Sequence, residues 1–257
     1  MLNETLKEFL DFKYQQFNCG DFIADDPVGI PHRYSIQEDI EIAGFIAASL
    51  AWGNRKSIIS SCNKIMEAMG NSPYDFVMNY STKKSKVLDG IKHRTFNAFD
   101  LEVFILCLQN VYQKHQNLEN LFVKLFQENP DFGKAISQFK SAFLGDFISS
   151  RTQKHISNPA INSSAKRLCM YLRWMVRKDN NGVDLGIWNS SISPAILHLP
   201  LDVHTGNISR KLGLLQRTQN DWKAVQEITQ KLREFCPEDP IKYDFALFGL
   251  GAIEKFE

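Results

Sequence analysis

Hydrophobic residues recur along nearly the whole chain with the three- and four-residue spacing that places one face of an α-helix against a core. Convincing two-residue alternation bounded by turn residues, which is typical of strands, does not occur in the sequence. The pattern therefore predicts an all-α protein. Helices are expected at about 36–52, 55–69, 100–115, 118–127, 131–147, 165–178, 203–212, 221–235 and 241–253.

The helix from Ile36 to Trp52 is apolar on almost every side and contains several small residues that permit close helix packing. A helix without a polar face is expected in the protein interior. Ser35-Ile-Gln-Glu38 has the spacing of a capping box at its start, and Gly53 is suited to end it. Asn54 is placed to cap the next helix.

With 257 residues, 44% of them hydrophobic, the chain can bury a sizeable core without disulfide or metal staples. We expect one compact unit over residues 1–257, with two lobes on either side of a central cleft. Lobe A is expected at about 36–185, as a helical barrel with a hairpin, and lobe B at about 1–35 plus 186–257.

The most apolar run has 11 residues, from Ile42 to Trp52, well short of the roughly 20 that span a bilayer. We therefore expect no membrane insertion. The five cysteines are odd in number and widely spaced, which is typical of reduced thiols in the cytoplasm. Since neither the cysteines nor the six histidines have metal-site spacing, we expect a cytoplasmic monomer with no metal and no cofactor.

The net charge of +1 means that an anionic partner must be bound by a local basic patch. Seven basic residues and no acidic residue lie between Arg151 and Lys178, the sharpest charge asymmetry of the chain. On the helix at 165–178, Leu168, Leu172, Met175 and Val176 form the expected core stripe, opposite Lys166, Met170, Arg173, Trp174 and Arg177.

Cations interleaved with a large aromatic side chain are suited to a phosphate backbone and an unstacked base. The alternative is a solvated face whose cations pair with acidic residues from elsewhere in the fold. Lys166 lies in the first turn of this helix, with Ser163 or Ser164 as the expected cap. The positive end of the helix dipole and Arg167 both disfavour a protonated ammonium there, and a lysine in such a place can act as a nucleophile. Taken alone, the position of Lys166 fits an ordinary surface lysine better.

Leu199-Pro-Leu-Asp-Val-His-Thr-Gly-Asn-Ile-Ser-Arg-Lys-Leu-Gly213 predicts a turn followed by a helix with Asp202 at its N-cap. Capping alone is one explanation of this aspartate. The segment also resembles the region around the active-site aspartate of the endonuclease III and oxoguanine glycosylase superfamily, which has a helix-hairpin-helix fold. The residues that match are Asp202, His204, Arg210, Leu212 and Gly213.

Two further stretches are similar to the same superfamily and occur in the same order. Ala47-Ala-Ser-Leu-Ala-Trp-Gly-Asn-Arg55 resembles the loop that wedges into DNA, and Ser163-Ser-Ala-Lys-Arg-Leu168 resembles the helix start that carries the catalytic lysine. The 36-residue spacing from Lys166 to Asp202 is most similar to archaeal oxoguanine glycosylases. Leu172-Arg-Trp-Met-Val-Arg-Lys178 and Lys242-Tyr-Asp-Phe-Ala-Leu-Phe-Gly-Leu-Gly251 resemble signatures of a bacterial conserved family of unknown function.

The resemblance departs from the superfamily at two places. Asn162-Ser-Ser-Ala165 lacks the glycines that let hairpin amides approach a phosphate, and the single cysteine near the C-terminus, Cys236, cannot hold the iron–sulfur cluster of some relatives.

The resemblance implies a DNA repair glycosylase and abasic-site lyase that flips a damaged base out of double-stranded DNA, an oxidised purine such as oxoguanine being favoured. It implies Lys166 as nucleophile at C1′ and Asp202 as its catalytic partner, with Asn54 or Arg55 as the wedge. The residues expected to bind DNA are Asn54, Arg55, Arg167, Arg173, Arg177, Lys178 and Arg210, and those expected at the base pocket are Trp52, Trp174, Tyr243 and Asp244.

Two alternatives remain open at the level of the sequence. The same fold could be a non-catalytic nucleic-acid-binding module that uses the surface from Arg151 to Lys178, or a helical interaction protein without a nucleic-acid role. Covalent trapping on abasic DNA separates the first alternative from the enzyme, and salt-dependent binding of duplex DNA separates both from the second.

Overall fold

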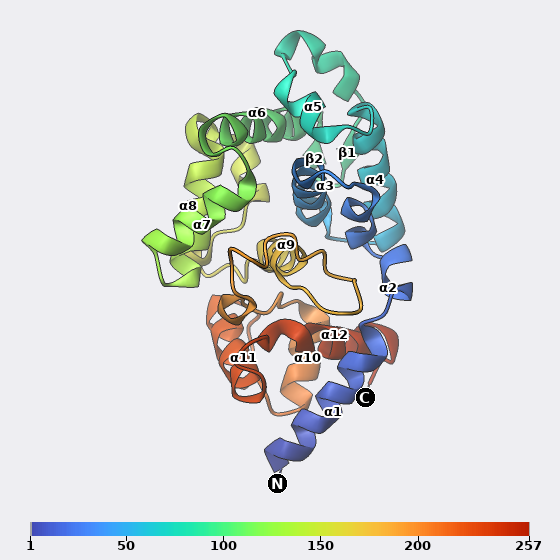
Figure 1. The fold of residues 1–257 in the computed structure, drawn as a ribbon, viewed down its shortest axis with the longest axis vertical. Helices are drawn as coiled ribbons and strands as arrows, with labels where there is room; N and C mark the ends of the chain where they lie inside the picture. Colours follow the sequence, from blue (N-terminus) through green and yellow to red (C-terminus); the bar gives the residue numbers. More distant parts are fainter. Residues whose placement is uncertain (1, 257) are drawn as a thin grey trace. The chain divides into compact units, whose positions relative to one another are not determined.

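The computed structural model describes residues 2–256 and confirms the all-α prediction (Figure 1). Besides its helices, the described chain has one hairpin of two short antiparallel strands, which the sequence pattern did not predict. The helices are α1 (Leu2–Phe17), α2 (Asp21–Ala24), α3 (Gln37–Leu50), α4 (Arg55–Ala68), α5 (Pro73–Met78), α6 (Ala98–His115), α7 (Leu118–Glu128), α8 (Phe132–Leu144), α9 (Lys166–Val176), α10 (Val203–Lys211), α11 (Trp222–Phe235) and α12 (Tyr243–Phe248), and the strands are β1 (Lys92–His93) and β2 (Phe96–Asn97).

The chain divides into two compact units. Unit 1 consists of Met1–Ala24 and Asn158–Glu257, and unit 2 consists of Asp25–Ser157. Lobe boundaries were expected near residues 35 and 185, whereas the units change at 24 and 157. The segment after residue 157 belongs to unit 1 because α9 is tied by ion pairs to the loop and helix that follow it, as described below.

In unit 2 the predicted buried helix is present as α3, which packs against α4 and α5. Its buried side chains include Glu41, whose carboxylate accepts hydrogen bonds from the Tyr112 hydroxyl at 2.8 Å and the Leu118 amide at 2.9 Å. The expected capping box is not formed, because α3 begins at Gln37 with Ile36 at its N-cap. Asp39 in its first turn accepts instead from the amide of Tyr74, at the start of α5.

Aromatic side chains fill the rest of the unit 2 core. Phe45 of α3 contacts Phe104 of α6 and both Phe139 and Phe143 of α8, with ring centroids 4.9–5.9 Å apart. Such ring pairs add to the burial of apolar area by about 0.5–1.5 kcal/mol each. The aromatic cluster therefore fixes α6 and α8 against α3.

In unit 1 the two ends of the chain lie side by side. Figure 1 shows α1, in blue, along α12, in red, and α10 also packs against α12. Gly249 follows α12. Any larger residue would clash there, because a Cβ would lie 2.2 Å from the Phe17 ring. Close packing of α1 therefore depends on this glycine.

The helix α9 is buried almost all round, which corrects the expectation of a solvated or DNA-facing basic stripe. All nine residues from Leu168 to Val176 are buried, including Met170, Arg173 and Trp174. Arg173 and Arg177 do pair with acidic residues, as the alternative from the sequence expected, but they do so in the interior and not on a solvated face. The neutralising carboxylates come from Asp179, Asp184, Asp239 and Asp244.

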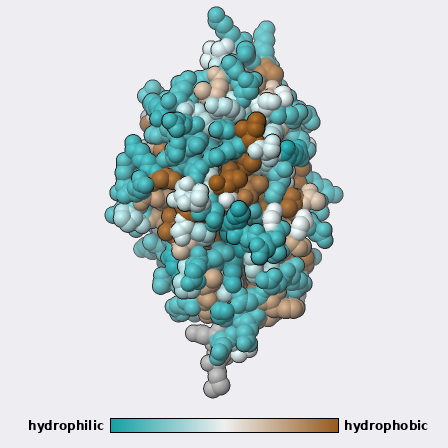
Figure 2. Space-filling view, in the orientation of Figure 1, coloured by the Kyte–Doolittle hydropathy of each residue, from teal (hydrophilic) through white to brown (hydrophobic). Residues whose placement is uncertain are grey.

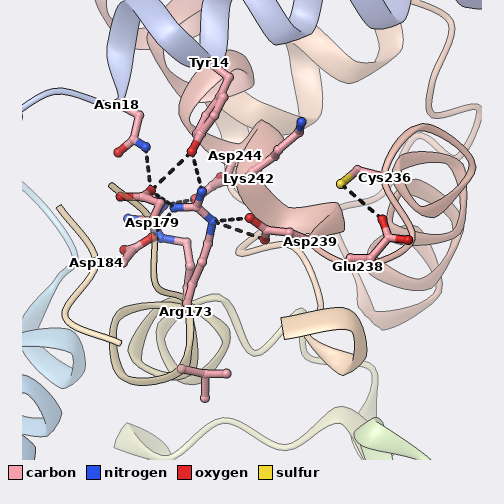
Figure 3. Close-up of polar contacts among 12 residues, drawn as sticks. Tyr14, Asn18, Arg173, Asp179, Asp184, Cys236, Glu238, Asp239, Lys242 and Asp244 are labelled. Carbon is pink, nitrogen blue, oxygen red and sulfur yellow. Dashed lines mark hydrogen bonds and ion pairs between the residues drawn. The ribbon is translucent and has the colours of Figure 1, made fainter. Parts of the chain in front are cut away.

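Arg177, at the C-cap of α9, is the centre of this buried ion cluster. Figure 3 shows the acidic side chains Asp179, Asp184 and Asp239 of the cluster close together. Its guanidinium donates to Asp179 at 2.6 Å, to Asp184 at 2.9 Å and to Asp239 at 2.9 Å, and also to the Tyr14 hydroxyl of α1 at 2.7 Å. Burial alone would lower the pKa of Arg177, but the surrounding carboxylates raise it well above its ordinary value. The cluster thus joins α1, α9 and the segment before α12.

Arg173 lies one turn earlier and shares the Asp184 carboxylate, with its Nε 3.1 Å from Oδ1. It also pairs with Asp244 in the first turn of α12, and its guanidinium lies 4.4 Å from the centre of the Phe245 ring. Because 173 and 177 are one turn apart, the two arginines fix both the position and the rotation of α9.

No helix among residues 2–256 is long and apolar enough to cross a membrane. The surface in the view of Figure 2 is mainly hydrophilic, with a number of hydrophobic residues reaching solvent. Two of the most exposed large apolar side chains belong to unit 1, Ile161 at 76% and Val203 at 65%. Ile161 is close in sequence to Lys166, and Val203 directly follows Asp202.

Removing the Arg177 guanidinium should destabilise the protein strongly, because the acidic side chains would remain buried without their cation. We expect Arg177→Met to lower the free energy of unfolding by about 3–5 kcal/mol. The exposed neighbour Lys178 supplies the matched control, since Lys178→Met should change the same quantity by less than about 0.5 kcal/mol. Urea unfolding followed by circular dichroism tests this, and equal effects of the two substitutions would contradict it.

Candidate active site around Lys166 and Asp202

A hairpin-like turn in unit 1 leads into α9. Asn158 caps a short 3-10 turn, Pro159–Ile161, and the chain then passes through Asn162 and Ala165, both with left-handed backbone at φ 61° and 49°. Glycine is the residue that adopts this conformation at least cost. The turn therefore has glycine-type backbone geometry at two places although the sequence has no glycine there.

The start of α9 differs from the expectation. Ala165 is the N-cap, without a side-chain cap, while the Ser163 hydroxyl accepts a hydrogen bond from the Ala165 amide at 3.3 Å. Lys166 is consequently the first residue of the helix, and its amide is among the groups that lack an intrahelical partner. The expectation that Ser163 or Ser164 caps the helix is wrong because the left-handed Ala165 occupies that place.

The turn is held against the beginning of α11. Ser163 forms an isolated antiparallel bridge with Asp221, and the Trp222 amide donates to the Asn162 carbonyl at 3.4 Å. Asp221 is also the N-cap of α11 and accepts from the Ala224 amide. Its other bonds, to Arg217, measure 2.7 Å and 2.5 Å.

Asp202 caps α10, as its position before Val203 predicts. Its Oδ1 accepts from the Thr205 amide at 3.0 Å, and the Thr205 hydroxyl accepts from the Asp202 amide at 2.8 Å, which completes a capping box. One carboxylate oxygen is thus used by the helix start, whose dipole favours a negative charge at this place. The other oxygen, Oδ2, is left for Lys166.

The structure brings the two predicted catalytic residues together. Lys166 Nζ lies 3.9 Å from Asp202 Oδ2, and the two side chains are 27% and 23% exposed. This separation is longer than a hydrogen bond. Among the described residues, Asp202 is the one polar partner of the Lys166 side chain. The amine is therefore oriented toward this carboxylate, and it is still reachable from solvent.

Asp244 lies behind this pair and is buried. Burial raises the pKa of Asp244 to about 6, while the Arg173 guanidinium opposes the increase. The charges of Asp202 and Lys166 also act on it, in opposite directions, which places all three groups in one electrostatic neighbourhood. Asp244 was expected to line a base pocket, but it is only 5% exposed and is paired with Arg173.

Asn220 and Gly206, which the sequence did not single out, hold Asp202 in place together with Arg210. The Asn220 amide donates to the Asp202 carbonyl at 3.0 Å and accepts from the Arg210 guanidinium at 2.6 Å. Gly206 leaves room for this contact, because a Cβ there would lie 2.6 Å from the Asn220 oxygen. The His-Thr-Gly segment contained the signal, since a glycine inside a helix suggests close approach of another group.

Arg210 is half-buried, and its Nε also donates to the Arg217 carbonyl at 2.8 Å. Its guanidinium is therefore directed into the protein, which does not support the expected contact with DNA. Arg173 and Arg177 are likewise wrong as DNA contacts, because they are buried in ion pairs. Trp174 and Tyr243 are wrong as base-pocket residues, since both are fully buried.

The other predicted contacts lie nearer the surface. Lys178 is exposed, and Arg167 is half-buried, which lowers the pKa of its guanidinium. Unit 2 carries Trp52, Asn54 and Arg55. Asn54 is exposed and accepts from the Ser57 amide as the cap of α4, which confirms its predicted cap role, and Arg55 Nε lies 3.9 Å from Asp26.

A pocket of about 360 Å³ lies beside α10 in unit 1 and includes neither Lys166 nor Asp202. Its lining consists of His204, Asn207, Ile208, Arg210, Lys211, Gly251, Lys255 and Phe256. Over residues 2–256, no group of three or more histidine, cysteine, aspartate or glutamate side chains is placed to hold a metal ion.

Fold and site together define an all-α protein in which a lysine and an aspartate from two helix starts form a partly exposed pair. The chain belongs to a family of proteins of unknown function, DUF2400, whose model matches residues 26–253. No curated protein matches the chain, and no solved structure matches it.

The ion pair of Arg217 with Asp221 can be tested by titration. The hydrogen bond from Arg217 lowers the pKa of Asp221 from 3.8 to about 2. Because the folded-state pKa lies below the ordinary value, the stabilisation is complete above pH 4 and is lost as the pH falls through about 2. Arg217→Gln should therefore raise the pKa of Asp221 toward its ordinary value, as measured by carboxyl NMR. An unchanged titration would contradict the assignment.

Proposed function

We propose that the protein is a DNA base-excision glycosylase with abasic-site lyase activity. The observation that carries the proposal is the 3.9 Å approach of Lys166 Nζ to Asp202 Oδ2, two groups that lie 36 positions apart in the sequence. An amine and a carboxylate that face one another at a solvent-reachable place are suited to act on the same sugar carbon. The resemblance of their surrounding segments to the glycosylase superfamily supports this choice of substrate.

In the proposed reaction, a nucleotide is first taken out of the base stack, at a cost of about a few kcal/mol that is smaller for a damaged or mispaired base. Asp202 then stabilises the positive charge that develops on the sugar as the bond from C1′ to the base breaks. The base leaves with the electron pair of that bond and takes up a proton. Asp202 lies at the positive end of the α10 dipole as its N-cap.

Lys166 supplies the covalent step. Its uncharged amine forms a bond to C1′ and loses a proton, and the ring oxygen leaves C1′ as a hydroxyl, which gives an imine. Loss of a proton from C2′ then expels the 3′ phosphate, which cleaves the strand. The side chains near this amine are Asp202 and the buried Asp244, whose charge adds to the field of the site.

The substrate class follows from the resemblance, with an oxidised purine such as oxoguanine in double-stranded DNA favoured. Asn54 and Arg55 remain the proposed wedge residues of unit 2. Lys178 and Arg167 remain proposed phosphate contacts of unit 1, whereas Arg173, Arg177 and Arg210 are used within the protein. Exposed Ile161 and Val203 offer apolar contact near the proposed nucleophile and its partner in the sequence.

One observation favours a second candidate, a nucleic-acid-binding module without catalysis. The Lys166–Asp202 contact is within the range of an ion pair, and a protonated lysine held by an aspartate is not a nucleophile. Under this alternative the protein binds DNA but forms no covalent intermediate. The following experiments separate the two functions.

The imine predicts a trappable adduct. In the presence of borohydride, the wild-type protein should become linked to an oligonucleotide that carries an abasic site, because reduction converts the imine to a stable amine. Lys166→Ala should lose at least about 99% of the adduct, and Lys231→Ala, which removes an exposed lysine of α11 paired with Glu234, should retain it. Gel analysis measures the linked fraction, and a wild-type protein that binds this DNA without linkage supports the non-catalytic module.

Asp202→Asn separates the two chemical steps. Asparagine is as good a helix cap as aspartate, so the fold should be retained. Release of oxoguanine from a duplex should fall about 100- to 1000-fold, since the developing positive charge loses its counterion. Trapping on a preformed abasic site should fall much less, because no base has to leave. Equal losses in both assays would contradict the assigned role of Asp202.

A further inference from the structure

The tip of the β1–β2 hairpin in unit 2 carries an exposed arginine on an aromatic ring. Lys92 pairs with Asn97 and His93 with Phe96, so Arg94 and Thr95 form the two-residue turn. Arg94 has left-handed backbone, φ 54°, a conformation that costs energy in any residue other than glycine. Its guanidinium carbon lies 4.7 Å from the centre of the Trp52 ring. The residue with the unfavourable backbone is thus the one whose guanidinium lies on the Trp52 ring.

Two anchors hold this turn rigid. The buried His93 ring donates from Nε2 to the Trp52 carbonyl at 3.2 Å and accepts at Nδ1 from the Ser61 hydroxyl at 3.0 Å, which joins the hairpin to the end of α3 and to α4. On the other side, Arg151 donates to the Thr95 carbonyl at 3.0 Å and pairs with Asp100 at 2.8 Å. The Arg94 side chain is therefore presented from a fixed base.

Gly53 completes the arrangement. Its φ of 111° is strained for any other residue, and a Cβ there would lie 3.0 Å from Arg94 Nη1. A side chain at Gly53 would press on the guanidinium, which would have to shift by a few tenths of an ångström. A cation over an indole ring gains about 0.5–2 kcal/mol, depending on exposure.

Charge indicates what this surface binds. Arg94, Lys92 and Lys56 are exposed, and within residues 2–256 none of the three has an ion-pair partner. Two other cations of the same unit, Arg55 and Arg151, are paired with Asp26 and Asp100. Lys56 lies in the first turn of α4, which packs against β1, so the unpaired cations belong to adjoining elements.

We propose that Trp52 and Arg94, with the unpaired lysines beside them, form the surface by which unit 2 binds a nucleic-acid strand. The proposal rests on the proposed function for its choice of an anionic, base-containing partner. The Arg94 guanidinium offers planar donors to a phosphate and a flat cationic face to an unstacked base, while the Trp52 ring holds it in place. This assigns Arg94, which the sequence did not indicate, to substrate binding.

The test is the salt dependence of DNA binding by the full-length protein. The probe is a fluorescent duplex with a tetrahydrofuran abasic analogue, which cannot form an imine, and anisotropy gives Kd at several salt concentrations. Arg94→Gly suits the left-handed backbone, so the fold should be retained. We expect Kd to rise about tenfold at low salt and the slope of log Kd against log salt to fall by about one.

Two further variants make the interpretation specific. Arg94→Lys keeps the charge and loses the planar group, so it should keep most of the salt slope and bind more weakly than wild type. Lys124→Ala is the matched control, because Lys124 is an exposed cation of unit 2 that is paired with Glu128. It should leave both Kd and the slope unchanged. Thermal unfolding of each variant verifies that the fold is intact.

The inference is overturned if Arg94→Gly binds the probe with wild-type affinity and slope, or if the wild-type protein does not bind it at low salt. Failure of the proposed chemistry is a separate result. A protein that loses affinity on Arg94→Gly but forms no borohydride-trapped adduct would retain this binding surface and lose the glycosylase assignment. An adduct that depends on Lys166, together with unchanged binding in Arg94→Gly, would give the opposite outcome.

Discussion

Two arginine side chains in the interior of unit 1 must be neutralised by carboxylates, and this requirement determines how α9 packs. A guanidinium removed from water is tolerated only when its donors are satisfied and its charge is balanced. Arg173 and Arg177 meet both conditions through Asp184, Asp239 and Asp244. Since the two arginines are one turn apart, their partners fix the rotation of α9 as well as its depth. The direction of Lys166, two turns before Arg173 on the same face, follows from that rotation.

Lys166 and Asp202 both lie at helix starts, where the helix dipole attracts the carboxylate and repels the ammonium. The positive end of α10 favours the carboxylate that caps it, and the start of α9 opposes a cation. A 3.9 Å approach lets the carboxylate offset the second effect without a direct hydrogen bond that would immobilise the amine. Asn220, Arg210 and Gly206 hold the backbone of Asp202 from behind, so the geometry does not depend on the ion pair alone.

Left-handed backbone in residues other than glycine occurs just before Lys166, the proposed nucleophile, and at Arg94, the proposed strand contact. In unit 1 it allows the turn before α9 to form at Asn162 and Ala165, and in unit 2 it places Arg94 over Trp52. Each conformation is maintained by contacts outside the turn, with Asp221 and Trp222 in one case and His93 and Arg151 in the other. Strain of this kind persists when the surrounding structure stabilises it, and it is concentrated at binding sites.

Periodicity and capping chemistry, which depend on neighbouring residues, determined the helical class, the buried helix α3 and the caps at Asn54 and Asp202. The charge run from Arg151 to Lys178 was visible in the sequence, but its meaning was not, because the carboxylates that neutralise Arg173 and Arg177 come from separate segments up to 71 residues away. The contact of Asn220 with Asp202 was hidden for the same reason, whereas the hairpin with Arg94 was missed because its two-residue strands are too short to show an alternating pattern. Local pattern determines which face a helix can bury, whereas only the assembled fold decides which charges meet there.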